Sequence, residues 1–239
     1  MFATRRERRD RSWQRWLQSL EQPFDLVPGA EAGAAFEAAW TKSRGQGFTP
    51  LIIQPGFDAP VRAGPAPFDR DFDGAADEYF ASRTRALAEA AEEFALFDDI
   101  PEVAPGPAQS LSMTDLLSQT RPLSPYHEVA ILRLPCAESW KIPLFLHIGG
   151  PADETERDTA EEIDLQRQWF ERFGAELCCV GERVWQFRVA HPPRNHRDAV
   201  ELLRQHYLYA WVDDAYDQEI IEQSAAQLRV DTHWMFNWV

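Results

Sequence analysis

The order of apolar segments in the second half of the chain constrains the fold most. The run "WKIPLFLHIGG" is almost continuously apolar, as a strand in the middle of a sheet would be. The segments in order are a strand at 140–150, a helix from Thr159 to Gly174, a hairpin over 175–190, helices at about 196–209 and 217–228, and an aromatic strand over 232–239. This β-α-β-β-α-(α)-β order is the ferredoxin-like, split βαβ pattern. We therefore predict an α+β fold with a ferredoxin-like C-terminal unit.

The first half of the chain reads as a helical and α/β extension of that unit. Trp13, Trp16, Leu17 and Leu20 follow the spacing of one buried helical stripe, which predicts a helix over 4–20. Further along, "AEAGAAFEAAWTKSR" and the alanine-rich stretch from 74 to 97 predict helices, and "FTPLIIQP" predicts one strand. We expect a mostly helical region at 1–110 and an α+β domain at 111–239, or one continuous domain spanning both.

The charge of the chain bears on its partners. The formal net charge is −15, although the first 15 residues are rich in arginine. An acidic surface repels a phosphate backbone, so the body of the protein is not expected to bind nucleic acid, whereas basic proteins would be attracted. The three cysteines, Cys136, Cys178 and Cys179, form no disulfide framework, and in a regular strand the adjacent pair would point to opposite faces. With no signal peptide and no apolar stretch long enough to span a membrane, we predict a cytoplasmic protein.

The stretch "VAHPPRNHRDAVEL", residues 189–202, is the densest cluster of chemically versatile side chains. Most of it is explained as the corner where a strand ends at Pro-Pro and a helix begins at an Asn195 cap, with His196 and Arg197 exposed in the first turn. The alternative is that His191 or Arg194 contacts a ligand at the helix N-terminus.

Metal-binding patterns are incomplete. Asp69, Asp71, Asp73 and Gly74 match the first half of a calcium loop, but Phe80 stands where the last, bidentate glutamate should be. No histidine or cysteine pair has zinc-site spacing, yet His147 and His233 lie in predicted strands and could meet across a sheet. We predict no bound cofactor, and keep calcium or zinc as the alternatives.

An acidic group surrounds the start of the last predicted helix. It consists of Asp213, Asp214, Asp217, Glu219 and Glu222. A solvated helix start, favoured by the helix dipole, explains these carboxylates. The alternative is a docking patch for a basic partner.

The chain also resembles a known family. The segments "WKIPLFLHIGG", "RQWFERFGAEL", "WQFRVAHPPRNHRDAVELLRQHYLY" and "HWMFNWV" are similar to the bacterial domain-of-unknown-function family DUF4253, and the match is best over 139–239. The loop after Gly149-Gly150 departs from the family, because "PADETE" stands where members often carry an Asn-Cys-Pro-like stretch. The resemblance implies a bacterial cytoplasmic protein and supplies no catalytic residues.

Three functional hypotheses follow. The first is a non-enzymatic binding protein, such as an immunity or antitoxin-like protein that neutralises a basic partner, because the chain is acidic, rich in aromatic residues and without a catalytic motif. The second is a hydrolase or metal-dependent enzyme with a site between the two halves, built from His147, His191 or His233 and nearby carboxylates. The third is a small-molecule sensor with an aromatic pocket.

Overall fold

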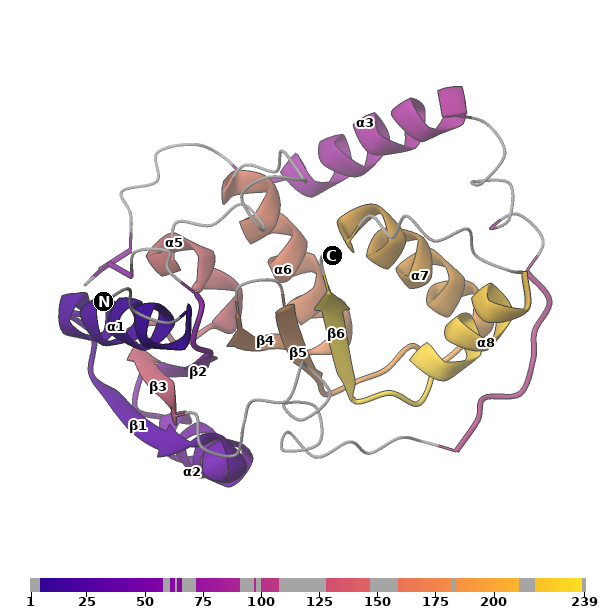
Figure 1. Ribbon diagram of the computed structural model, residues 1–239. Coiled ribbons are helices and arrows are strands. Elements are labelled where there is room, and N and C mark those ends of the chain that lie inside the picture. The colour runs from indigo at the N-terminus through magenta and orange to yellow at the C-terminus, as the bar shows by residue number, and fades with distance from the viewer. Residues whose placement is uncertain are drawn as a thin grey trace.

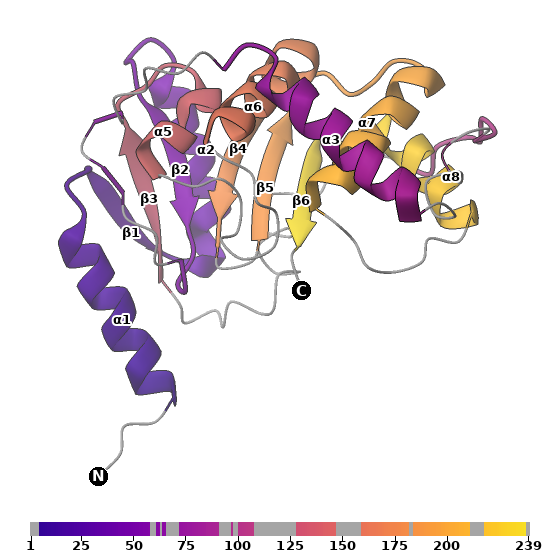
Figure 2. The same ribbon diagram turned by 90° about the horizontal axis from the view of Figure 1, so that it is seen from above.

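A six-stranded mixed sheet organises the molecule, with the strand order β1-β3-β2-β4-β5-β6. The computed structural model describes residues 5–57, 61–62, 64–65, 72–90, 97, 100–107, 128–146, 159–181, 184–210 and 218–237. The strands are β1 (Phe24–Pro28), β2 (Thr49–Ile53), β3 (Glu128–Leu134), β4 (Ala175–Val180), β5 (Val184–Val189) and β6 (His233–Asn237). Among these six strands, β2 and β4 are the pair that runs parallel, and Figure 2 shows β1 and β6 at the two edges.

Helices cover the two faces of the sheet unequally. The helices are α1 (Arg5–Ser19), α2 (Ala32–Ser43), α3 (Ala75–Ala90), α5 (Pro143–Leu146), α6 (Thr159–Phe173), α7 (His196–Ala210) and α8 (Gln218–Leu228). The larger core cluster joins apolar residues of α1, α5, α6 and α7 to one face, whereas α2 packs on the other face in a smaller cluster. Figure 1 shows α2 on the opposite side of the sheet from α5 and α6.

An aromatic cluster centred on Trp169 fills the core between α6, α7 and the last strands. The indole is fully buried, its Nε1 donates to Gln205 Oε1 at 2.9 Å, and Phe236 stacks on it with a centroid distance of 5.7 Å. Phe187, Tyr209 and Trp234 meet it edge-on. Much of the aromatic content is therefore accounted for by core packing.

Several predicted elements are confirmed. The predicted stripe of α1 is buried at Trp13, Trp16 and Leu17, and the two indoles stack with centroids 5.0 Å apart. The predicted hairpin is β4 and β5, and the aromatic terminal strand is β6. Gly174 ends α6 with φ +59°, and a Cβ there would lie 2.8 Å from Ala190 Cβ, so glycine is needed for both reasons.

The predicted strand at 140–150 is wrong for its described part. Ser139–Lys141 form a 3-10 turn and α5 follows, while residues 147–150 lie outside the described residues. Pro143 opens the helical turn, a position that needs no backbone N–H donor. Ile142, Phe145 and Leu146 are buried in the larger core cluster, so the run is apolar because it packs onto the sheet rather than because it is a strand of it.

The α+β class is confirmed, but the ferredoxin-like strand order is not observed. The strand β2, from the first half of the chain, lies between β3 and β4, so these two run in opposite directions. In addition, β6 pairs with β5. The described part of 1–110 contributes two strands, β1 and β2, where one was predicted. The sequence gives little signal for β1, because it is a short edge strand whose side chains are mostly exposed. Strands from both 1–110 and 111–239 thus share one sheet.

Candidate functional site

Residues 97 and 100–107 lie against α7 and α8 and contribute to the lining of two surface hollows. Phe97 and Ile100 are buried in a cluster with residues of both helices. Their backbone is also tied down, because Arg204 Nη2 donates to Phe97 O at 2.8 Å and His196 Nε2 lies 2.7 Å from Ile100 O. Further along, Arg229 pairs with Glu102 at 2.8 Å.

The first hollow, which we name the corner pocket, has a volume of about 670 Å³ and lies at the first turns of α7. It is lined by Phe97, Ile100, Arg172, His196, Arg197, Asp198, Val200, Glu201 and Arg204. Three of these residues are arginines. Arg172 lies in the last turn of α6, and Arg197 and Arg204 lie at two places on α7. The pocket is therefore a basic site on an acidic protein.

The corner beside this pocket is built as the sequence predicts. Asn195 Oδ1 accepts the Asp198 N–H at 2.8 Å, and the Asn195 amide donates back to the Asp198 carboxylate at 2.8 Å. This reciprocal cap begins α7 directly after the Pro-Pro pair, so the interpretation of this stretch as a strand-to-helix corner is confirmed.

The two predicted ligand contacts in this stretch do not line the pocket. His191 and Arg194 are exposed and lie outside its lining, whereas His196 and Arg197 line it. His196 is half-buried rather than exposed as predicted. Arg172 and Arg204 were missed altogether, because no local pattern connects the end of α6 with the second and third turns of α7.

The second hollow, which we name the α8 groove, has a volume of about 640 Å³ and is lined by Val103, Ala104, Gln218, Glu219, Glu222 and Gln223. Two members of the predicted acidic group, Glu219 and Glu222, line it together. Ile220, next to Glu219, is 51% exposed, the larger value of the two big apolar side chains that are exposed in the described part of the chain. Asp213, Asp214 and Asp217 lie outside the described residues.

His233 and His147 cannot be compared directly. His233 opens β6 opposite Arg188 of β5 and is half-buried. Burial, together with the positive charge of Arg188, lowers the pKa of His233. His147 lies outside the described residues, so its predicted meeting with His233 stays a prediction. Within the described ranges, no histidine side chain is hydrogen-bonded to a carboxylate.

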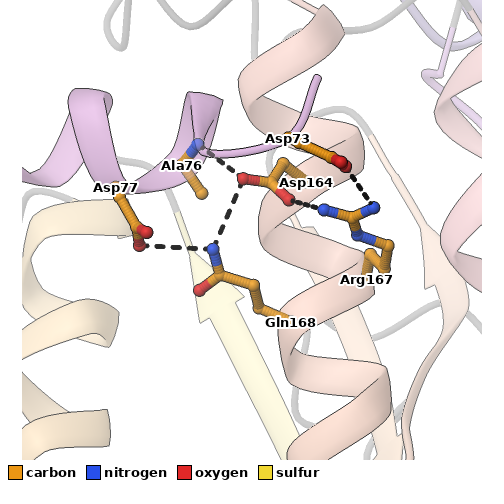
Figure 3. A network of polar contacts seen from close by, with 6 residues as sticks. All are labelled: Asp73, Ala76, Asp77, Asp164, Arg167 and Gln168. Atoms are coloured by element: carbon orange, nitrogen blue, oxygen red, sulfur yellow. Dashed lines mark hydrogen bonds and ion pairs between the residues drawn. The ribbon is translucent and has the colours of Figure 1, made fainter. Parts of the chain in front are cut away.

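Of the three carboxylates predicted to bind calcium, the structure describes Asp73, and this carboxylate is bound by an arginine. Arg167 donates to Asp73 at 2.6 Å and also to Asp164 at 2.6 Å, as Figure 3 shows. A guanidinium bound to a carboxylate competes with a cation for the same oxygens. Asp69 and Asp71 lie outside the described residues. Among the residues that are described, no group of three or more His, Cys, Asp or Glu is arranged to hold a metal ion.

The cysteines are placed differently from the sequence prediction. A β-bulge between Leu177 and Cys179 makes Cys178 an extra residue in β4, so both thiols pack in the same cluster under α2 rather than on opposite faces. Burial raises the pKa of Cys179 to about 12 and also raises the pKa of Cys178 well above its usual range. Neither thiol is prepared to act as a nucleophile.

No helix among the described residues is both long and apolar enough to cross a bilayer.

Comparison with known proteins agrees with the resemblance noted in the sequence. No curated protein and no solved structure matches the chain. Over residues 130–238, however, the chain matches the family described as a domain of unknown function, DUF4253.

Proposed function

We propose that this chain is a non-enzymatic binding protein for a basic protein, and that the α8 groove is the docking site. The observation that carries the proposal is that the carboxylates of Glu219 and Glu222 line one surface hollow, while Ile220, the next residue on α8, is an exposed apolar side chain outside that lining. An apolar anchor beside charged groups is the usual anatomy of a protein interface.

Charge supports the same class of partner. The net charge of −15 attracts a basic protein from a distance, and the carboxylates at the groove would then fix its orientation. Glu219 accepts a hydrogen bond from Gln223 at 3.1 Å within its own helix, which orders one carboxylate before a partner arrives. A protein that neutralises a basic toxin, in the manner of an immunity protein or antitoxin, fits this description.

The test is affinity purification of the full chain from its native host, with matched charge variants. We expect wild-type protein to retain one basic protein, and the double variant Glu219→Lys/Glu222→Lys to lose it. The control is Glu31→Lys/Glu78→Lys, which makes the same charge change at exposed positions away from the groove and should retain the partner.

The identified partner is then purified and titrated against both double variants and Ile220→Ala. We expect Ile220→Ala to weaken binding by about tenfold, because hot-spot truncations cost on the order of 1–2 kcal/mol or more. If no protein is retained, or if the groove and control variants lose the partner equally, the proposal is wrong.

A further inference from the structure

The corner pocket concentrates positive charge on a chain that carries little of it. The sequence has 39 acidic and 24 basic residues, yet Arg172, Arg197 and Arg204 converge on one hollow together with His196. These side chains come from α6 and from separate turns of α7, so tertiary packing rather than a local run of basic residues brings them together.

Two of the three arginines have no anionic partner. In the described part of the chain, Arg172 and Arg197 form no ion pair and no side-chain hydrogen bond, although the Arg172 guanidinium lies over the Phe173 ring at 4.9 Å. Other described arginines behave differently, since Arg133 and Arg229 pair with carboxylates. The unpaired guanidinium groups leave donors available to a ligand.

Two carboxylates also line the pocket and they are not equivalent. The Asp198 carboxylate accepts the Asn195 amide in the cap of α7, so it is engaged in beginning the helix. Glu201 is exposed and takes no part in that cap, so its charge can be removed without changing how the helix begins. With three arginines and two carboxylates, the pocket carries a net positive charge. Removing the Glu201 carboxylate therefore tests whether the pocket binds an anion.

The rest of the lining is apolar. Phe97, Ile100 and Val200 contribute a hydrocarbon wall beside the guanidinium groups. The volume of about 670 Å³ lies within the usual range of small-molecule sites, which is roughly 300–1,000 Å³. The lining therefore has one part for an anion and one part for an apolar group.

We propose that the corner pocket binds a small molecule that carries a phosphate group, with Arg172 and Arg197 holding the phosphate and the apolar side chains of Phe97, Ile100 and Val200 contacting the remainder. The planar fork of arginine matches phosphate oxygens in a bidentate manner. This site is distinct from the α8 groove and does not depend on the proposed protein partner.

The test uses inorganic phosphate and phenyl phosphate as probes, titrated into the full chain at constant ionic strength and followed by NMR. We expect saturable binding of both, with phenyl phosphate binding more tightly because its ring contacts the apolar wall. Arg172→Gln and Arg197→Gln should each weaken binding by about tenfold, the effect of losing one charge-assisted contact. Glu201→Gln should strengthen it severalfold by removing the repelling carboxylate.

The matched control is Arg194→Gln, an exposed arginine three positions before Arg197 that does not line the pocket. It removes the same charge and should change binding by less than about twofold. Shifts that do not saturate, or an Arg194→Gln loss equal to that of Arg197→Gln, would show general attraction to positive charge and overturn the proposal. Retained phosphate binding in Glu219→Lys/Glu222→Lys keeps this result separate from the test of the α8 groove.

Discussion

His206 is a histidine whose surroundings keep it neutral. Its ring is half-buried with Nε2 buried and unpartnered among the described residues, and its centroid lies 4.6 Å from Trp234 and 4.9 Å from Phe236. Burial lowers the pKa of His206 from 6.5 to about 3. Between these two values the unfolded chain binds more protons than the folded chain, so stability rises with pH across this window.

We therefore expect the His206 contribution to be fully present above pH 6.5 and to be lost as the pH falls toward 3. At pH 5 the loss should be about 2 kcal/mol of unfolding free energy relative to pH 7.5. Urea unfolding at both pH values measures it. His206→Phe should reduce this difference by that amount, whereas His191→Gln, at an exposed histidine, should not; an unchanged difference in His206→Phe would contradict the assignment.

The buried thiols lead to a second prediction at this scale. Because burial raises the pKa values of Cys178, Cys179 and Cys136, the last to about 11, we expect native protein to react with a thiol reagent such as DTNB far more slowly than the unfolded chain. All three thiols should react in denaturant. Rapid modification of two or more thiols per native chain would contradict the burial of Cys178 and Cys179 in β4.

At the scale of elements, the contact between α3 and α6 depends on one buried carboxylate. Asp164 of α6 is fully buried, and its Oδ2 accepts the Ala76 N–H at the start of α3 at 3.0 Å. Its other oxygen faces Arg167, and Gln168 of the same helix reaches both Asp164 and Asp77 of α3 (Figure 3). A carboxylate from one helix thus completes the N-terminus of another.

Asp164→Ala should cost about 3 kcal/mol of unfolding free energy, because it leaves the buried Ala76 N–H without its acceptor and leaves Arg167 with Asp73 as its remaining carboxylate partner. Asp164→Asn keeps an acceptor oxygen and should cost less. The control is Asp73→Ala, which removes the 71%-exposed partner of the same arginine and should cost under about 1 kcal/mol. Urea denaturation compares the three; equal losses at 73 and 164 would contradict the buried tether.

At the scale of the whole molecule, the family-matched segment does not contain all of its own sheet. The match begins at residue 130, within β3, yet β3 pairs with β1 and β2, both from the first half of the chain. In a fragment 128–239, β3 would lose both neighbours and β4 would lose its parallel partner. Unpaired strand edges and an uncovered apolar face do not support independent folding.

We expect fragment 128–239 to show no cooperative thermal transition by circular dichroism, and co-expression with 1–127 to restore one. The full chain is the positive control. A cooperative transition in the isolated fragment would mean that the C-terminal half is a domain on its own.

The sequence by itself determined the elements whose signals are local. Four features follow from residues that lie close together in the sequence. They are the buried stripe of α1, the Asn195 cap of α7, the glycine that ends α6 and the β4–β5 hairpin. The α+β class follows from their order. For the candidate sites, the sequence identified the corner at 189–202 and the acidic group at the start of α8, but it selected His191 and Arg194, which do not line the pocket.

Tertiary structure decided everything that depends on a distant partner. An apolar run such as 142–146 is equally suited to a strand and to a helix packed on a sheet. In the folded chain 143–146 form α5, and β2 rather than this run lies between β3 and β4. The bulge that puts both cysteines on one face depends on the register with β5, and the corner pocket depends on how α6 meets α7. Local spacing carries no information on these contacts, because they form between residues far apart in the chain.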